Sequence, residues 1–126
     1  TLDHICDNFS GSIFLVFGNM EDWHIPDIKY LDEYKNAKIF PKHADLEVDK
    51  KKVAAVHYPD YAKRLAETGK YEIVFYGHTH KPWDENIGDC RVLNPGSVAG
   101  DRFPPTLAVW DTKTMDIKLI LLNEMK

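Results

Sequence analysis

Short apolar runs that end in polar residues are the main pattern along this chain. Three of them, at 13–17, 53–56 and 73–76, are rich in β-branched and aromatic residues. Their length and composition predict strands buried on both faces, the kind found in parallel sheets. Because ligands of open α/β sheets bind outside the carboxyl ends of the strands, we expect a functional site where these runs end.

The remaining segments predict a mixed α/β domain. Apolar residues at helical spacing indicate helices over 1–9 and 60–67, and Pro26 can open a short helix that reaches about Tyr34. A short strand is expected at 37–40. Alternating residues on both sides of turn sequences predict three hairpins, at 44–48 with 52–56, 83–87 with 91–93, and 106–111 with 115–122.

Size, charge and cysteine content restrict the class of protein. The 126 residues suit one domain, 1–126. Sixteen basic and 20 acidic residues give a formal net charge of −4, which disfavours nucleic acid as a partner. No apolar stretch is long enough to span a membrane, and no secretory signal is visible at the start. We therefore expect a cytoplasmic protein in which Cys6 and Cys90 are reduced.

The most informative residues are Gly77 to His80, which directly follow the apolar run at 73–76. His78 and His80 are two residues apart, so in an extended segment their side chains point to the same side, with α-carbons about 7 Å apart. Two imidazoles placed in this way can hold two metal ions about 3.5–4 Å apart, or chelate a single one. Two solvated histidines in a surface turn are the alternative.

The other two runs end in further candidate ligands, His57 after 53–56 and Asn19 after 13–17. Alone, His57 would more often be a hydrogen-bonded rim histidine and Asn19 a turn residue. Their shared position at strand ends favours a metal site instead. Glu21 and Asp22 could orient a ligand from the same loop or simply be solvated.

Two segments after residue 90 could complete such a site. Asn94 to Ser97 can form a simple turn, or its backbone amides and Ser97 can close the wall of the site. Arg102 can approach an anionic substrate.

The order of these motifs resembles the calcineurin-like metallophosphoesterases, in particular their small bacterial and archaeal phosphodiesterase branch. The residues that carry the resemblance are Gly18 with Asn19, the strand end at His57, Gly77 to His80, and Asn94 to Ser97. It covers essentially the whole chain. It implies an α/β/β/α sandwich with a two-metal centre at the strand ends.

The resemblance also implies roles for single residues. Asn19, His57 and His78 would bind one divalent transition metal ion and His80 the other, with Asn19 and His57 part of the catalytic centre. Manganese is the expected metal, and iron, nickel or zinc are also typical. The ions would activate a hydroxide that attacks a small phosphodiester or phosphomonoester, with Arg102 as a substrate-binding candidate. The oligomeric state is open, a homo-oligomer included.

The sequence departs from the family pattern in ways that keep other interpretations open. The Asp-x-His and Gly-Asp strand ends of the family are absent, and Tyr58 stands where glycine is usual. Because the first residue is threonine and not methionine, we expect a chain that lacks the first β-α-β unit. The alternative function is an inactive phosphoesterase-fold scaffold that binds a partner protein. A domain with a single structural metal is a third interpretation.

Overall fold

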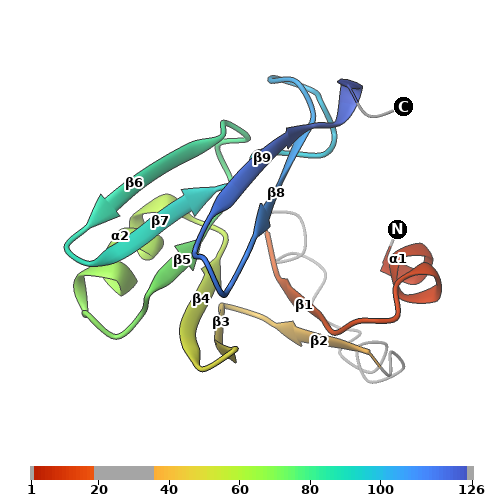
Figure 1. Ribbon diagram of the computed structural model, residues 1–126. Coiled ribbons are helices and arrows are strands. Elements are labelled where there is room, and N and C mark those ends of the chain that lie inside the picture. The colour runs from red at the N-terminus through yellow and green to blue at the C-terminus, as the bar shows by residue number, and fades with distance from the viewer. Residues whose placement is uncertain (1, 19–35, 125–126) are drawn as a thin grey trace.

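The computed structural model describes residues 2–18 and 36–124 (Figure 1). The predicted helix at 26–34 lies outside the described residues, as do Asn19, Glu21 and Asp22. The described residues form a mixed α/β fold with a central sheet, one helix on a face of that sheet and further strands on the other side (Figure 1), in agreement with the predicted fold class.

A five-stranded mixed sheet forms the centre of the fold. Its strands are, in spatial order, β3 (His43–Val48), β4 (Lys51–Val56), β5 (Ile73–Phe75), β7 (Cys90–Asn94) and β6 (Trp83–Ile87). The interior strands run parallel to one another, and the two edge strands are antiparallel to their neighbours. Apolar sequence occupies the interior, because only there are both faces of a strand covered.

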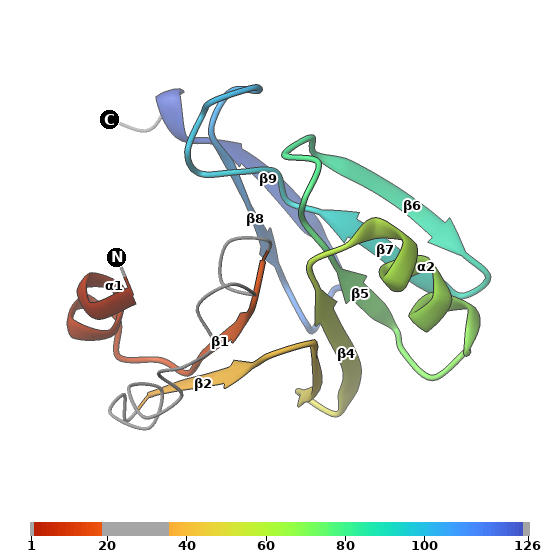
Figure 2. The same ribbon diagram turned by 180° about the vertical axis from the view of Figure 1, so that it is seen from behind.

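Helix α2 (Pro59–Glu67) covers one face of this sheet, as Figure 2 shows. Pro59 begins the helix, because its fixed φ and missing N–H suit the first turn. Ala62 and Ala66 are buried against the sheet, and Gly69, with φ +74°, follows the helix end. The predicted helix at 60–67 is confirmed. The buried cluster between helix and sheet consists of Ala54, Val56, Ala62, Ala66, Val74, Tyr76, Cys90 and Val92.

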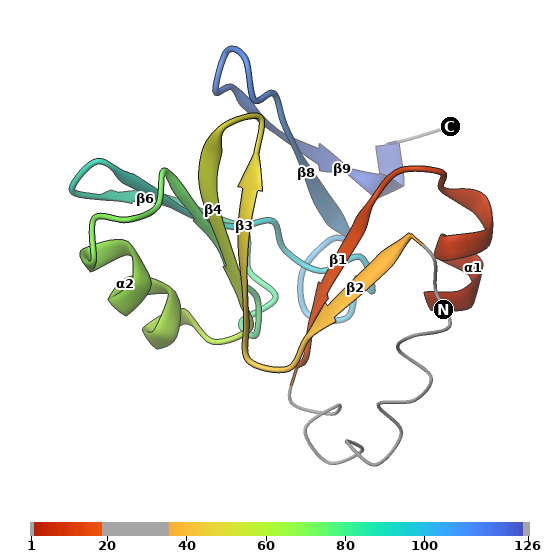
Figure 3. The same cartoon turned by 90° about the horizontal axis from the view of Figure 1, so that it is seen from below.

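Two strand pairs lie on the side of the five-stranded sheet opposite α2 (Figures 1 and 3). They are the parallel pair β1 (Ile13–Val16) and β2 (Ala37–Phe40) and the antiparallel pair β8 (Thr106–Trp110) and β9 (Ile117–Leu121). The rings of Phe75 and Trp110, with centroids 6.1 Å apart, connect the layers. Helix α1 (Leu2–Asn8) lies beyond β1 and β2, and the short 3-10 helix η3 (Leu122–Glu124) follows β9.

The three predicted hairpins are confirmed. In the first, Asp49 and Lys50 make the turn between β3 and β4 with φ of 50° and 66°. The other two pair β6 with β7 and β8 with β9. Cys6 and Cys90 form no disulfide with each other. Of the described helices, none has the length and apolar character that crossing a membrane requires.

The apolar run at 13–17 forms a parallel strand, but the expectation that this strand is buried on both faces is wrong. Strand β1 pairs with β2 in a separate two-stranded sheet. It is not buried on both faces, since 46% of the Phe14 surface is exposed. An apolar run indicates a strand, but the choice of partner strand depends on contacts between distant parts of the chain, which periodicity does not contain.

The other two runs do end side by side. Strands β4 and β5 are adjacent and parallel, with Ala55 paired to Phe75. Beyond them the Gly77 amide donates to the His57 carbonyl at 3.0 Å. The backbone that carries His57 is therefore bonded directly to the loop that carries His78 and His80.

Candidate metal centre

His57 and His78 form a close pair where β4 and β5 end. The Nδ1 atom of His78 lies 3.3 Å from the Nε2 atom of His57, and the ring centroids are 5.1 Å apart. The two rings are nearly perpendicular, at 78°. The parallel register of their strands produces this meeting, because the carboxyl ends of adjacent parallel strands share one edge of the sheet.

The separation of the two nitrogens fits a shared metal ion. In a tetrahedral site with metal–nitrogen bonds of about 2.0–2.1 Å, two ligand nitrogens lie roughly 3.3 Å apart. The observed distance is 3.3 Å, which a hydrogen bond between the rings also allows. Among residues 2–18 and 36–124, no group of three or more His, Cys, Asp or Glu side chains is placed to hold a metal ion. Of the four predicted ligands, Asn19 lies outside the described residues.

Tyr58 packs against both rings of the pair. Its ring centroid lies 4.9 Å from that of His57 and 4.9 Å from that of His78. With 42% of its surface exposed, Tyr58 forms one side of the site and is not a core residue. The residue that stands where the family usually has glycine thus lies directly beside both histidines.

The histidine loop, defined as residues 77–80, is not extended, which corrects the predicted backbone. His78 and His80 both have left-handed conformations, with φ of 73° and 62°. Thr79 between them donates its amide to the Gly77 carbonyl at 2.9 Å. Left-handed backbone is costly for residues other than glycine and is concentrated at functional sites, where the surroundings maintain it.

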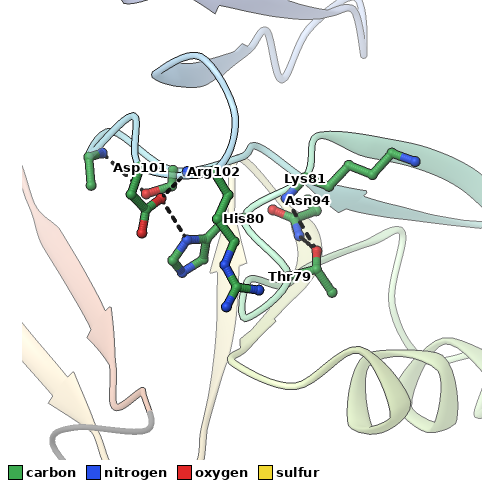
Figure 4. Close-up of polar contacts among 8 residues, drawn as sticks. Thr79, His80, Lys81, Asn94, Asp101 and Arg102 are labelled. Atoms are coloured by element: carbon green, nitrogen blue, oxygen red, sulfur yellow. Dashed lines mark hydrogen bonds and ion pairs between the residues drawn. The ribbon is translucent and has the colours of Figure 1, made fainter.

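Because of this turn, His78 and His80 have different partners. His78 lies against His57, whereas His80 Nδ1 lies 3.0 Å from the Asp101 carboxylate (Figure 4). This hydrogen bond lowers the pKa of the Asp101 carboxyl, and the Arg102 amide supports it from the same loop. A carboxylate on one imidazole nitrogen fixes the ring and leaves the other nitrogen for a ligand. The structure thus brings together His57 with His78, and separately His80 with Asp101.

Arg102 is exposed, and its amide donates to Asp101 Oδ1 at 2.8 Å. The two residues lie in the loop that reaches His80, so the predicted substrate-binding residue is in the neighbourhood of the histidine loop (Figure 4). Asp101 was not among the predicted site residues. The sequence around a charged loop residue does not indicate a functional role, and only the fold brings Asp101 to His80.

Asn94 is a second residue whose role the sequence did not reveal. It is fully buried at the end of β7, next to β5. Its amide donates to the Thr79 hydroxyl at 2.9 Å and to the Gly77 carbonyl at 3.3 Å, and its oxygen accepts from the Gly96 amide at 2.9 Å. Asn94 therefore connects the histidine loop to the turn at 94–97. The sequence had indicated only a turn or a wall of the site at these residues, and not this connection.

Replacing Asn94 with alanine is expected to lower the free energy of unfolding by about 2 kcal/mol, because buried hydrogen-bond partners lose their bonds. Urea unfolding followed by circular dichroism measures this change. Asn86→Ala, at an exposed position of β6, is the matched control. Equal losses in the two variants would show that the buried bonds of Asn94 do not stabilise the loop.

Replacing Asp101 with alanine is expected to raise the Mn²⁺ concentration needed for half-maximal metal binding about 10-fold, because His80 loses the partner that orients it. Titration of the metal-depleted protein with Mn²⁺ gives this concentration. Asp89→Ala, in the turn between β6 and β7, is the control. An unchanged titration curve for Asp101→Ala would mean that the contact with His80 does not prepare a ligand.

The fold and this site define a class of protein with a histidine centre at the ends of parallel strands, and comparison with known proteins gives the family. The chain belongs to the calcineurin-like phosphoesterase superfamily, whose domain model matches residues 1–115. The resemblance seen in the sequence is confirmed.

Individual relatives agree with this assignment. Phosphodiesterase MJ0936 of Methanocaldococcus jannaschii is 26% identical over 120 residues, which span 93% of this chain and 72% of that protein. A solved structure described as a novel archaeal phosphodiesterase matches with a TM-score of 0.83 and 25% identity, over 96% of this chain and 74% of that one. Vps29 of Entamoeba histolytica, solved in complex with zinc, has a TM-score of 0.51 and 16% identity, over 94% of this chain and 85% of that one. The Vps29 likeness shows the shared fold alone.

Proposed function

We propose that this protein is a metal-dependent phosphoesterase that hydrolyses a small phosphodiester, with His57, His78 and His80 in its metal centre. The observation that carries the proposal is the 3.3 Å separation between His57 Nε2 and His78 Nδ1 at the ends of two parallel strands. Membership of a phosphoesterase superfamily and similarity to a named phosphodiesterase support the reaction class.

The residues of the chain have distinct tasks in this proposal. Bound divalent ions would supply an activated hydroxide and neutralise the charge that develops on the phosphoryl oxygens. His57 and His78 would hold the metal, together with Asn19. Asp101 keeps the His80 ring in place through Nδ1. Tyr58 restricts access to the pair, and Arg102 attracts the anionic substrate.

The finer properties of the centre stay predictions from the sequence. They are two metal ions per chain, manganese as the metal, a cytoplasmic location, and a homo-oligomer as one of the open assembly states. Zinc in the related Vps29 structure supports a divalent transition metal in this fold. The scaffold alternative is not favoured, because His57 and His78 are brought together at the strand ends and a similar protein is named a phosphodiesterase.

Hydrolysis of bis(p-nitrophenyl) phosphate, compared with that of p-nitrophenyl phosphate, tests this function. We expect the diester to be the better substrate, activity to disappear with EDTA, and Mn²⁺ to restore it. Folded protein that hydrolyses neither ester with manganese, nickel, iron or zinc would overturn the proposed function.

A further inference from the structure

A groove of about 350 Å³ lies between α2 and β6, next to the histidine loop. Pro59 and Lys63 of α2 form one wall, and Thr79, Lys81 and Trp83 form the other, with Tyr76 among the lining residues. We call this feature the Trp83 groove. No role in the metal centre accounts for its residues.

Trp83 is the largest side chain of the groove and is unusually exposed to solvent for a tryptophan. Half of its surface, 50%, is exposed, at the start of the edge strand β6. The Lys81 ammonium lies 5.2 Å from the ring centroid. An exposed indole is a platform on which flat aromatic rings stack. Lys81 is itself exposed, so its ammonium can leave the ring face to a stacked ligand and pair with an anionic group of that ligand.

The charge of the groove favours an anion. Lys63 and Lys81 are both exposed lysines, and Glu85 is the single acidic residue that lines it. Burial and the nearby Glu85 raise the pKa of Tyr76, so the tyrosine adds no negative charge at neutral pH. Two ammonium groups against one carboxylate leave a positive balance for a phosphate ester.

Two residues that line the groove are next in sequence to residues of the proposed metal centre. Pro59 follows Tyr58, whose ring lies 4.9 Å from both histidine rings. Thr79 lies between His78 and His80 in the histidine loop. Figure 4 shows that the side chain of Lys81, which lines the groove, extends away from His80 and from its contact with Asp101. An ester with its phosphate at the histidine pair can thus place its organic group in the groove.

We propose that the Trp83 groove is the subsite for the organic group of the substrate, and that this group is a flat aromatic ring of the kind a nucleoside carries. Trp83 stacks on the ring, while Lys63 and Lys81 attract the negative charge of the ester. This inference rests on the proposed phosphoesterase function, which it extends from a reaction class to a substrate class.

Two esters with the same leaving group test the subsite in the metal-loaded protein. One is the p-nitrophenyl ester of thymidine 5′-monophosphate, and the other is methyl p-nitrophenyl phosphate. Because only the first carries a base, the ratio of their kcat/KM values measures the contribution of the groove. We expect Trp83→Leu to lower this ratio about 10-fold through lost stacking. Lys81→Ala is expected to raise the KM of the thymidine ester about 3-fold.

Matched controls are available on the other layer of the fold. Lys38 lies 5.3 Å above the Phe40 ring, so Lys38→Ala removes the same kind of cation–π pair at a distance from the groove. Phe14→Leu removes an aromatic ring with a similar exposed fraction, 46%. Both controls are expected to keep the wild-type ratio. An unchanged ratio in Trp83→Leu, with hydrolysis intact, would overturn the subsite and leave the phosphoesterase function standing.

A binding measurement decides the subsite if the wild-type protein hydrolyses neither ester. Calorimetry would then compare adenosine 5′-monophosphate with inorganic phosphate in the wild type, Trp83→Leu and Lys81→Ala. Tighter binding of the nucleotide, lost in both variants, would support the groove as an aromatic anion site although the reaction class had failed. Equal binding of the nucleotide and phosphate, or equal affinities in all three proteins, would overturn it.

Discussion

Replacing His78 with alanine is expected to lower kcat/KM for bis(p-nitrophenyl) phosphate by more than about 100-fold. Loss of a residue that only orients a metal ligand commonly costs roughly 10–100-fold in metal affinity or activity. His78 is proposed as a direct ligand, and it lies 3.3 Å from its neighbour His57. Steady-state kinetics with saturating Mn²⁺ measures the effect. We expect kcat to fall most, because the metal stabilises charge that develops only during the reaction.

The matched control for this variant is His4→Ala. His4 is an exposed histidine of α1, which lies outside the five-stranded sheet that carries the histidine loop. Its replacement is expected to leave kcat/KM within about 2-fold of the wild type, because surface substitutions have small effects. If His78→Ala kept most of the wild-type activity, the reaction would not take place at the histidine pair.

Replacing Gly96 with alanine is expected to lower the free energy of unfolding by about 3 kcal/mol or more. Gly96 has a φ of 87°, which strains any side chain. An added methyl group would overlap the Thr106 hydroxyl and lie 3.0 Å from Pro82. Thr106 cannot easily move, since it is 3% exposed and its hydroxyl donates to the Pro95 carbonyl at 2.8 Å. Crowding of this kind costs roughly 1–3 kcal/mol in addition to the backbone strain.

Gly88→Ala separates the two contributions. Gly88 also has a positive φ, of 59°, but apart from its two neighbours in the chain no residue has an atom within 4 Å of the position of an added methyl group. This variant is expected to lose about 1 kcal/mol from backbone strain alone. Thermal unfolding of both variants gives the difference. Equal losses would show that Thr106 gives way and that the turn at 94–97 is not tightly packed.

The histidine pair could be predicted because its information is local. Each of the runs at 53–56 and 73–76 is buried in the sheet interior, and each is followed directly by its histidine. Once two such strands lie parallel and adjacent, the geometry of the sheet brings His57 and His78 together. The hairpins could be predicted for the same reason, since the turn and both strands are consecutive in sequence.

The rest of the site could not be predicted because it depends on contacts between distant segments. The contacts of His80 with Asp101 and of Asn94 with Thr79 join residues 21 and 15 positions apart. The pairing of β1 with β2 instead of with the main sheet is a choice between partners that the apolar pattern leaves open. The left-handed backbone of His78 and His80 could not be predicted from the extended strand before it, although histidine is among the residues enriched in this conformation.

The measurement that tests the account most directly is the transition-metal content per chain of the purified protein, determined by elemental analysis for the wild type and His78→Ala. We predict two bound metal ions per wild-type chain and clearly fewer metal ions in the variant. Circular dichroism is expected to show that both proteins are folded. Folded wild-type protein that retains no metal after dialysis against Mn²⁺, Fe²⁺, Ni²⁺ or Zn²⁺ would contradict a metal centre at His57 and His78.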